Sequence, residues 1–151
     1  MLINLEGRRN IIHNPADVAN IIHNILWGEE VFDREKEHFW TFGLRRDNSI
    51  KYIDLISLGT VDGAMVHPRE SFRRAIHEGI VSLVFVHNHP SGALKASEQD
   101  KGMCSRLVKT GTIIAIEVHD FIIVGNTATR EDTPGFLSFK EIGSLNLRGA
   151  I

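Results

Sequence analysis

Apolar residues near the start of the chain recur at the spacing of one buried helix face. This stripe consists of Val18, Ile21, Ile22, Ile25 and Leu26, which follow the i, i+3, i+4, i+7 pattern. Asn14 and Pro15 precede the stripe in the order typical of a helix N-terminus, and Gly28 follows it. We therefore expect an amphipathic helix between Pro15 and Gly28, with His13 and His23 on its surface.

Residues 37–58 have the composition of a β-hairpin. An aromatic-rich run over residues 37–44 is followed by the polar segment 45–49 and by a second apolar run over residues 50–58. Strand-forming residues on either side of a polar turn predict two paired strands. Residues 81–86 form a nearly continuous apolar run, which is typical of a strand covered on both faces.

The remaining patterns add two helices and further strands around this run. Pro68 and Gly79 bound a predicted helix over residues 68–78, and Gly111 closes another over residues 97–109. Two strands are expected over residues 112–118 and 121–124, and a short edge strand over residues 136–139. These elements predict an α/β protein with a mixed sheet flanked by helices, in a single domain over residues 1–151.

Composition narrows the class of protein without identifying a chemistry. The 151 residues carry 17 Lys and Arg, 19 Asp and Glu and a formal net charge of −2, so no overall attraction to nucleic acid or to an anionic membrane is expected. No apolar run approaches the roughly 20 residues of a membrane span, and the first residues lack the pattern of a signal peptide. The single cysteine, Cys104, cannot form an internal disulfide. We therefore expect a cytoplasmic protein without membrane contact, in which Cys104 is a core residue.

Two of the eight histidines stand out by their spacing. His87 and His89 lie two residues apart at the end of the apolar run over residues 81–86, so their imidazoles point to the same side of an extended chain. Pro90 favours an extended backbone at His89. Two imidazoles that face one point are suited to Zn²⁺.

Asp100 is the candidate third ligand. It precedes Met103 and Cys104 by three and four residues, which places its carboxylate on the buried side of the predicted helix. A second interpretation is that Ser97 and Asp100 form a capping box, in which Asp100 only satisfies a backbone N–H. Taken with the two histidines the ligand interpretation is favoured, and a set of three ligands leaves open the fourth position that a catalytic zinc needs.

The motif and its surroundings resemble a known family. The sequence His-Asn-His-Pro-Ser-Gly at residues 87–92, followed by Ser97 and Asp100, resembles the zinc motif of the JAMM (MPN-plus) metalloproteases and, in its particular form, the RadC branch. Further likeness lies in the same order at residues 33–34, 37–40, 57–60, 66–70 and 138–139. The resemblance covers nearly the whole chain and implies the cytidine-deaminase-like JAB/MPN fold.

The resemblance also implies roles for individual residues. It implies that His87, His89 and Asp100 hold zinc and that Ser97 stabilises the oxyanion of a tetrahedral intermediate. It further implies that Glu37, directly before the aromatic strand, is the acid/base acting on a zinc-activated water. Glu35 is a less favoured candidate for that base. The function implied is a zinc-dependent hydrolase, most naturally a peptidase or isopeptidase with a peptide or protein substrate.

The chain departs from RadC in three respects. Residues 93–96 lack the prolines common in the RadC loop, and Phe121 stands where the family usually has histidine. We also expect a short stand-alone form without the helix-hairpin-helix region found upstream in longer RadC proteins, and that region is the main family reason to expect DNA contact.

Three other functions are weighed against the hydrolase. A nuclease is suggested by the letters His-Asn-His, but HNH endonucleases spread these residues over a ββα metal finger. A DNA-repair or mobile-element role follows from the historical label of RadC, and contact with nucleic acid is left open. A non-catalytic MPN-like binding module would be expected to lack the ligands. An edge strand allows pairing with a second copy, so a homodimer is also considered.

Overall fold

The computed structural model describes residues 10–59, 66–126, 129 and 131–145, which are built around one mixed β-sheet. The strands are β1 (His38–Leu44), β2 (Ile50–Leu58), β3 (Ser82–His89), β4 (Glu117–Gly125) and β5 (Phe136–Ser138), in the order β2-β1-β3-β4-β5. Among these strands β3 and β4 run parallel, and the other neighbours run antiparallel.

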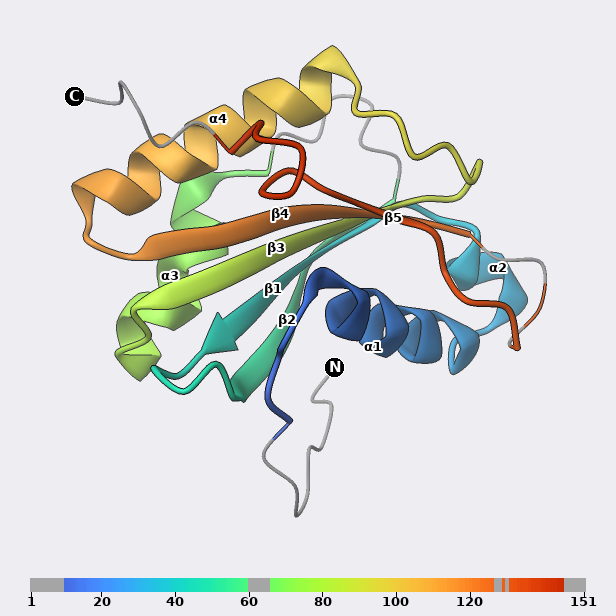
Figure 1. Ribbon diagram of the computed structural model, residues 1–151, viewed down its shortest axis with the longest axis horizontal. Coiled ribbons are helices and arrows are strands. Elements are labelled where there is room, and N and C mark those ends of the chain that lie inside the picture. Colours follow the sequence, from blue (N-terminus) through green and yellow to red (C-terminus); the bar gives the residue numbers. More distant parts are fainter. Residues whose placement is uncertain (1–9, 60–65, 127–128, 130, 146–151) are drawn as a thin grey trace.

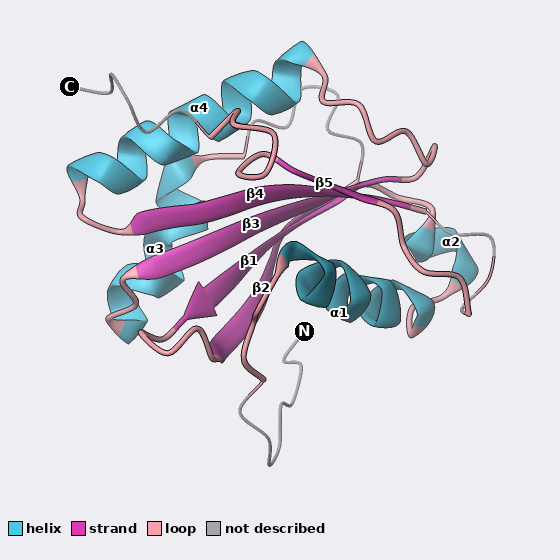
Figure 2. Ribbon diagram, viewed as in Figure 1, coloured by secondary structure: helices cyan, strands magenta, loops and turns pink. Residues whose placement is uncertain are grey.

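Helices cover both faces of this sheet. Helix α1 (Pro15–Trp27) lies on one face, and α3 (Pro68–Glu78) and α4 (Glu98–Ile113) lie on the other (Figure 1). The short helix α2 (Val31–Arg34) leads from α1 into β1 at the end of the sheet where β3 terminates (Figure 2). The arrangement confirms the predicted mixed sheet flanked by helices and is consistent with the JAB/MPN fold. None of the helices described is long and apolar enough to cross a membrane.

Alternating strand residues fill two apolar layers. Leu83 and Phe85 of β3 belong to the layer that contains Phe72 of α3 and Leu107 of α4. Val84 and Val86, which point the other way, pack in the layer of α1. Because β3 is buried on both faces, its sequence is almost uniformly apolar until it reaches the two histidines.

Several predicted boundaries are confirmed. Asn14 caps α1: its side chain accepts the Asp17 N–H at 3.1 Å, and Asp17 in return accepts the Asn14 N–H at 3.2 Å. The hairpin forms as predicted, with β1 and β2 joined through residues 45–49. Helix α3 ends at Gly79, whose φ of 66° is readily adopted by glycine. The single-domain prediction for residues 1–151 stays a prediction, because both ends lie outside the residues described.

The predictions for residues 97–124 need correction. Helix α4 does not close at Gly111 but runs to Ile113, so residues 112–113 are helical and not part of a strand. The two strands expected over residues 112–118 and 121–124 are one strand, β4. Asp120 interrupts the apolar pattern without breaking the strand, because the Ser138 hydroxyl and the Lys140 N–H donate to its carboxylate at 2.5 and 3.0 Å.

The prediction for His23 is also wrong. His23 is 6% exposed, and its ring packs edge-on against Trp27 at a centroid distance of 6.0 Å. It lines a small cavity together with Gly125 at the end of β4. The buried part of α1 is therefore wider than the apolar stripe indicates. The short helix α2 was not predicted.

We expect Gly111 and Gly102, both in α4, to respond in opposite ways to alanine. A Cβ at Gly111 would overlap the carbonyl oxygen of Ile116, whereas a Cβ at Gly102 meets nothing within 4 Å. Gly111→Ala should therefore lower the free energy of unfolding by about 1–3 kcal/mol. Gly102→Ala should raise it by about 0.5–1 kcal/mol, since alanine favours helix. Urea denaturation of both variants checks this, and equal stabilisation by the two would contradict the close approach at Gly111.

Candidate metal centre

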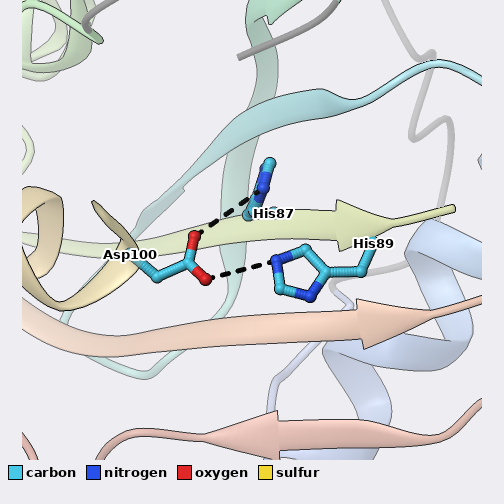
Figure 3. A group of neighbouring side chains, drawn as sticks. All are labelled: His87, His89 and Asp100. Carbon is cyan, nitrogen blue, oxygen red and sulfur yellow. Dashed lines mark ion pairs between the residues drawn. The ribbon is translucent and has the colours of Figure 1, made fainter. Parts of the chain in front are cut away.

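Three side chains from two neighbouring elements converge at the C-terminal end of β3. His87 and His89 are among the last three residues of the strand, and Asp100 is in the first turn of α4 (Figure 3). One ligand atom from each lies within 4.8 Å of the others. Over the part of the chain that the structure describes, no second group of three His, Cys, Asp or Glu residues converges in this way. The structure thus brings together the three residues predicted as metal ligands.

Local chain geometry explains this convergence. His87 and His89 project to one face of the sheet because strand side chains alternate. The chain turns immediately after His89, where the Gly92 N–H donates to the His89 carbonyl at 2.9 Å. Gly92 has a φ of 79°, in the region that favours glycine. The turn sends the chain back so that α4 begins beside the strand end.

Backbone carbonyls select which ring nitrogen each histidine offers. Nδ1 of His87 lies 3.0 Å from the His38 carbonyl, and Nδ1 of His89 lies 2.8 Å from the Ala93 carbonyl. Since a carbonyl only accepts, each Nδ1 carries a proton, and Nε2 is the atom available for a metal. Both Nε2 atoms face Asp100, at 3.9 Å from Oδ1 for His87 and 3.3 Å from Oδ2 for His89.

Asp100 serves the helix cap and the cluster at once. Its Oδ2 accepts the Ser97 N–H at 2.8 Å, and the Ser97 hydroxyl accepts the Asp100 N–H at 3.0 Å. A carboxylate has about four lone-pair sites, so this capping box leaves room for further contacts. The two interpretations of Asp100 are therefore compatible: the cap aims the carboxylate at the histidines.

Burial and hydrogen bonding set the charges of the cluster. Burial lowers the pKa of His87, whereas the hydrogen bond with Asp100 raises the pKa of His89. Burial alone would raise the pKa of Asp100, but hydrogen bonds from His89 and Ser97 outweigh it and lower the pKa to about 2. Asp100 is thus ionised and His87 neutral at pH 7, as metal ligation requires, and a metal ion at His89 Nε2 would compete with protonation of that atom.

Glu37 is placed close enough to act on both histidines. It is half-buried directly before β1, and its carbonyl accepts the Gly59 N–H at 2.9 Å. The main influence on the pKa is burial for His87 and the hydrogen bond with Asp100 for His89. The negative charge of Glu37 makes a smaller contribution, which raises the pKa of both rings. Glu35, the competing candidate for the acid/base, is exposed at the end of α2, and it lines the same cavity as His23.

The other histidines and the cysteine stay outside the cluster. His67 is exposed at the start of α3. His38 is fully buried, stacked on Trp40 at 4.8 Å and 2.9 Å from the Glu29 carboxylate. Cys104 packs in the core as predicted, where burial raises its pKa to about 12.

Asn88, between the two histidines, was not predicted as a functional residue. Its side chain is fully buried and forms hydrogen bonds with the backbone of Lys36 and of His38, the two neighbours of Glu37 in the chain. The signal was available in the sequence, because a polar residue in a strand covered on both faces needs a partner.

Comparison with known proteins identifies similar chains. The RadC-like JAB domain family matches residues 12–144. A UPF0758 protein of Pelodictyon phaeoclathratiforme is 40% identical over 141 residues, covering 93% of this chain and 60% of the relative. A UPF0758 protein of Rubrobacter xylanophilus is 36% identical over 137 residues, covering 91% of this chain and 55% of the relative. The chain spans little more than half the length of these relatives.

Proposed function

The chain belongs to the RadC-like JAB domain family, and from this membership and the geometry of the cluster we propose that it is a zinc-dependent hydrolase of the JAMM type. The observation that carries the proposal is the convergence of His87, His89 and Asp100 within 4.8 Å. Three protein ligands leave a tetrahedral position open for reactants, as in catalytic rather than structural zinc sites.

The donor set fits zinc. Two imidazole nitrogens and one carboxylate oxygen are ligands that Zn²⁺ accepts, and the second nitrogen of each ring is fixed by a backbone carbonyl. Zinc supplies two effects when bound: it lowers the pKa of water to about 7 and polarises a carbonyl oxygen.

The remaining chemistry falls to Glu37 and Ser97. In the proposed reaction the Glu37 carboxylate takes a proton from the attacking water and passes it to the leaving amine. The Ser97 hydroxyl accepts the Asp100 N–H, which uses a lone pair and leaves the hydroxyl proton to donate to an oxyanion. This division of roles suits cleavage of an amide, so we propose that the substrate bond is a peptide or isopeptide bond in a protein. We also propose a cytoplasmic location, because the single cysteine cannot form an internal disulfide.

A metal measurement joined to a cleavage screen tests this function. Protein purified without chelators is expected to contain about one zinc per chain and to cleave members of a peptide library. Cleavage should stop on chelation, return on addition of zinc, and be absent from His89→Ala. Protein without zinc would favour a binding module, and metal-dependent nicking of plasmid DNA without peptide cleavage would favour a nuclease.

A further inference from the structure

Asn88 lies between the two histidine ligands but points away from them. Successive side chains of a strand alternate, so Asn88 projects to the α1 face of the sheet while His87 and His89 face α4. Its exposure is 0%. A buried carboxamide is costly unless both its donor and its acceptor are satisfied.

The carboxamide of Asn88 bonds to the backbone on both sides of Glu37. Its Oδ1 accepts the His38 N–H at 2.5 Å, and its Nδ2 donates to the Lys36 carbonyl at 3.0 Å. These two backbone groups belong to the peptide bonds that flank the Glu37 Cα. The hydrogen bonds fix the orientation of the carboxamide. The reverse orientation would place the Nδ2 amide against the His38 N–H, donor against donor, and Oδ1 against the Lys36 carbonyl, acceptor against acceptor.

These bonds continue the sheet beyond the point where regular pairing stops. The β1–β3 ladder ends at the pair Phe39 and His87, so the backbone at residues 36–38 has left it. The side-chain amide of Asn88 offers a donor and an acceptor, as a peptide group does, and replaces the backbone hydrogen bonds that the β1–β3 ladder no longer makes at this point. His87 adds a third bond, from Nδ1 to the His38 carbonyl at 3.0 Å, which ties the metal ligand to the same segment.

We propose that Asn88 is a positioning residue that holds Glu37 in register with the metal ligands. The inference rests on the proposed function of Glu37 in proton transfer. Residues 87 and 88 together hold the backbone that carries the carboxylate. Loss of the Asn88 bonds leaves the His38 N–H without its acceptor and the Lys36 carbonyl with the His38 ring alone, which loosens this segment without removing a ligand. The expected signature is a defect in proton transfer with intact zinc binding.

The matched pair Asn88→Ala and Val86→Ala tests the inference. Both residues are buried on the same strand and the same face, but Val86 is not bonded to residues 36–38. Asn88→Ala should keep its zinc and its KM while kcat falls about 10- to 100-fold, the usual effect of losing an outer-shell partner. Val86→Ala should keep kcat. Amide hydrogen exchange at His38 should accelerate in Asn88→Ala alone. Asn88→Asp keeps the acceptor for His38 but sets a second oxygen against the Lys36 carbonyl, so it should also lower kcat.

A measurement on the wild-type protein tests the inference even if the variants do not fold. A scalar coupling across the hydrogen bond from the His38 amide nitrogen to the Asn88 side-chain carbonyl carbon is expected in the NMR spectrum, and its absence would overturn the inference. Unchanged kcat in zinc-loaded Asn88→Ala, with Glu37→Gln inactive, would also overturn it and leave the proposed function standing. Full activity in Glu37→Gln would instead refute the role of Glu37 itself.

Discussion

Glu37→Gln is expected to retain its zinc and to lose turnover by about 10²- to 10⁴-fold, the usual contribution of a positioned acid/base. Glutamine has the size of glutamate but cannot accept a proton at neutral pH. Glu37→Gln leaves intact the backbone hydrogen bonds of this segment to Gly59 and to the Asn88 side chain. Zinc should stay, because Glu37 is not among the three converging ligands.

Glu35→Gln provides the matched control for this loss. It makes the same chemical change two residues earlier, on an exposed side chain at the end of α2. The measurements are kcat, KM and zinc content of wild type and both variants with one cleaved peptide. If Glu35→Gln lost activity and Glu37→Gln kept it, the acid/base would have to be reassigned.

Asp100→Asn is expected to weaken zinc binding by about 100-fold or more, beyond the 10- to 100-fold cost of losing an outer-shell partner. The substitution removes the negative charge of the ligand set. Asparagine still offers an oxygen to the Ser97 N–H, which Asp100 accepts at 2.8 Å. Helix α4 should therefore begin at the same residue, and the metal-free protein should lose only the stabilisation that the charged carboxylate gains from its contact with His89.

Comparison of Asp100→Asn with Asp100→Ala separates the two roles of this carboxylate. Alanine removes the cap as well as the charge, at a further cost of about 1 kcal/mol in the metal-free protein. Zinc affinity is measured by competition with a chromophoric chelator, and stability by urea denaturation after removal of metal. If Asp100→Asn bound zinc with wild-type affinity, the Asp100 side chain would be a helix cap and not a metal ligand.

The convergence of His87, His89 and Asp100 was predictable because its geometry is local. The two-residue spacing of His87 and His89 fixes their common side, and the cap of α4 fixes Asp100. The hairpin and the helices α1 and α3 follow from equally local signals, namely polar turn residues, Asn14 and Gly79.

Features that depend on distant contacts were missed or misplaced. Gly111 reads as a helix end, but it is needed where α4 approaches the carbonyl of Ile116. Asp120 reads as a break between strands because its partner, Ser138, lies 18 residues away. His23 is buried and lines a cavity with Gly125 of β4, a distant neighbour that the helix pattern cannot reveal.

The hydrogen bonds of Asn88 also bear on the order in which the site assembles during folding. His87, His89 and Asp100 follow one another within β3, one loop and the first turn of α4. Closing this short loop costs little chain entropy, whereas the contact between His38 and Asn88 spans 50 residues. Contacts of such high sequence separation form slowly. Under the proposed function, we therefore expect the β3–α4 unit to bind a metal ion before the segment carrying Glu37 docks, so that metal uptake would precede catalytic competence.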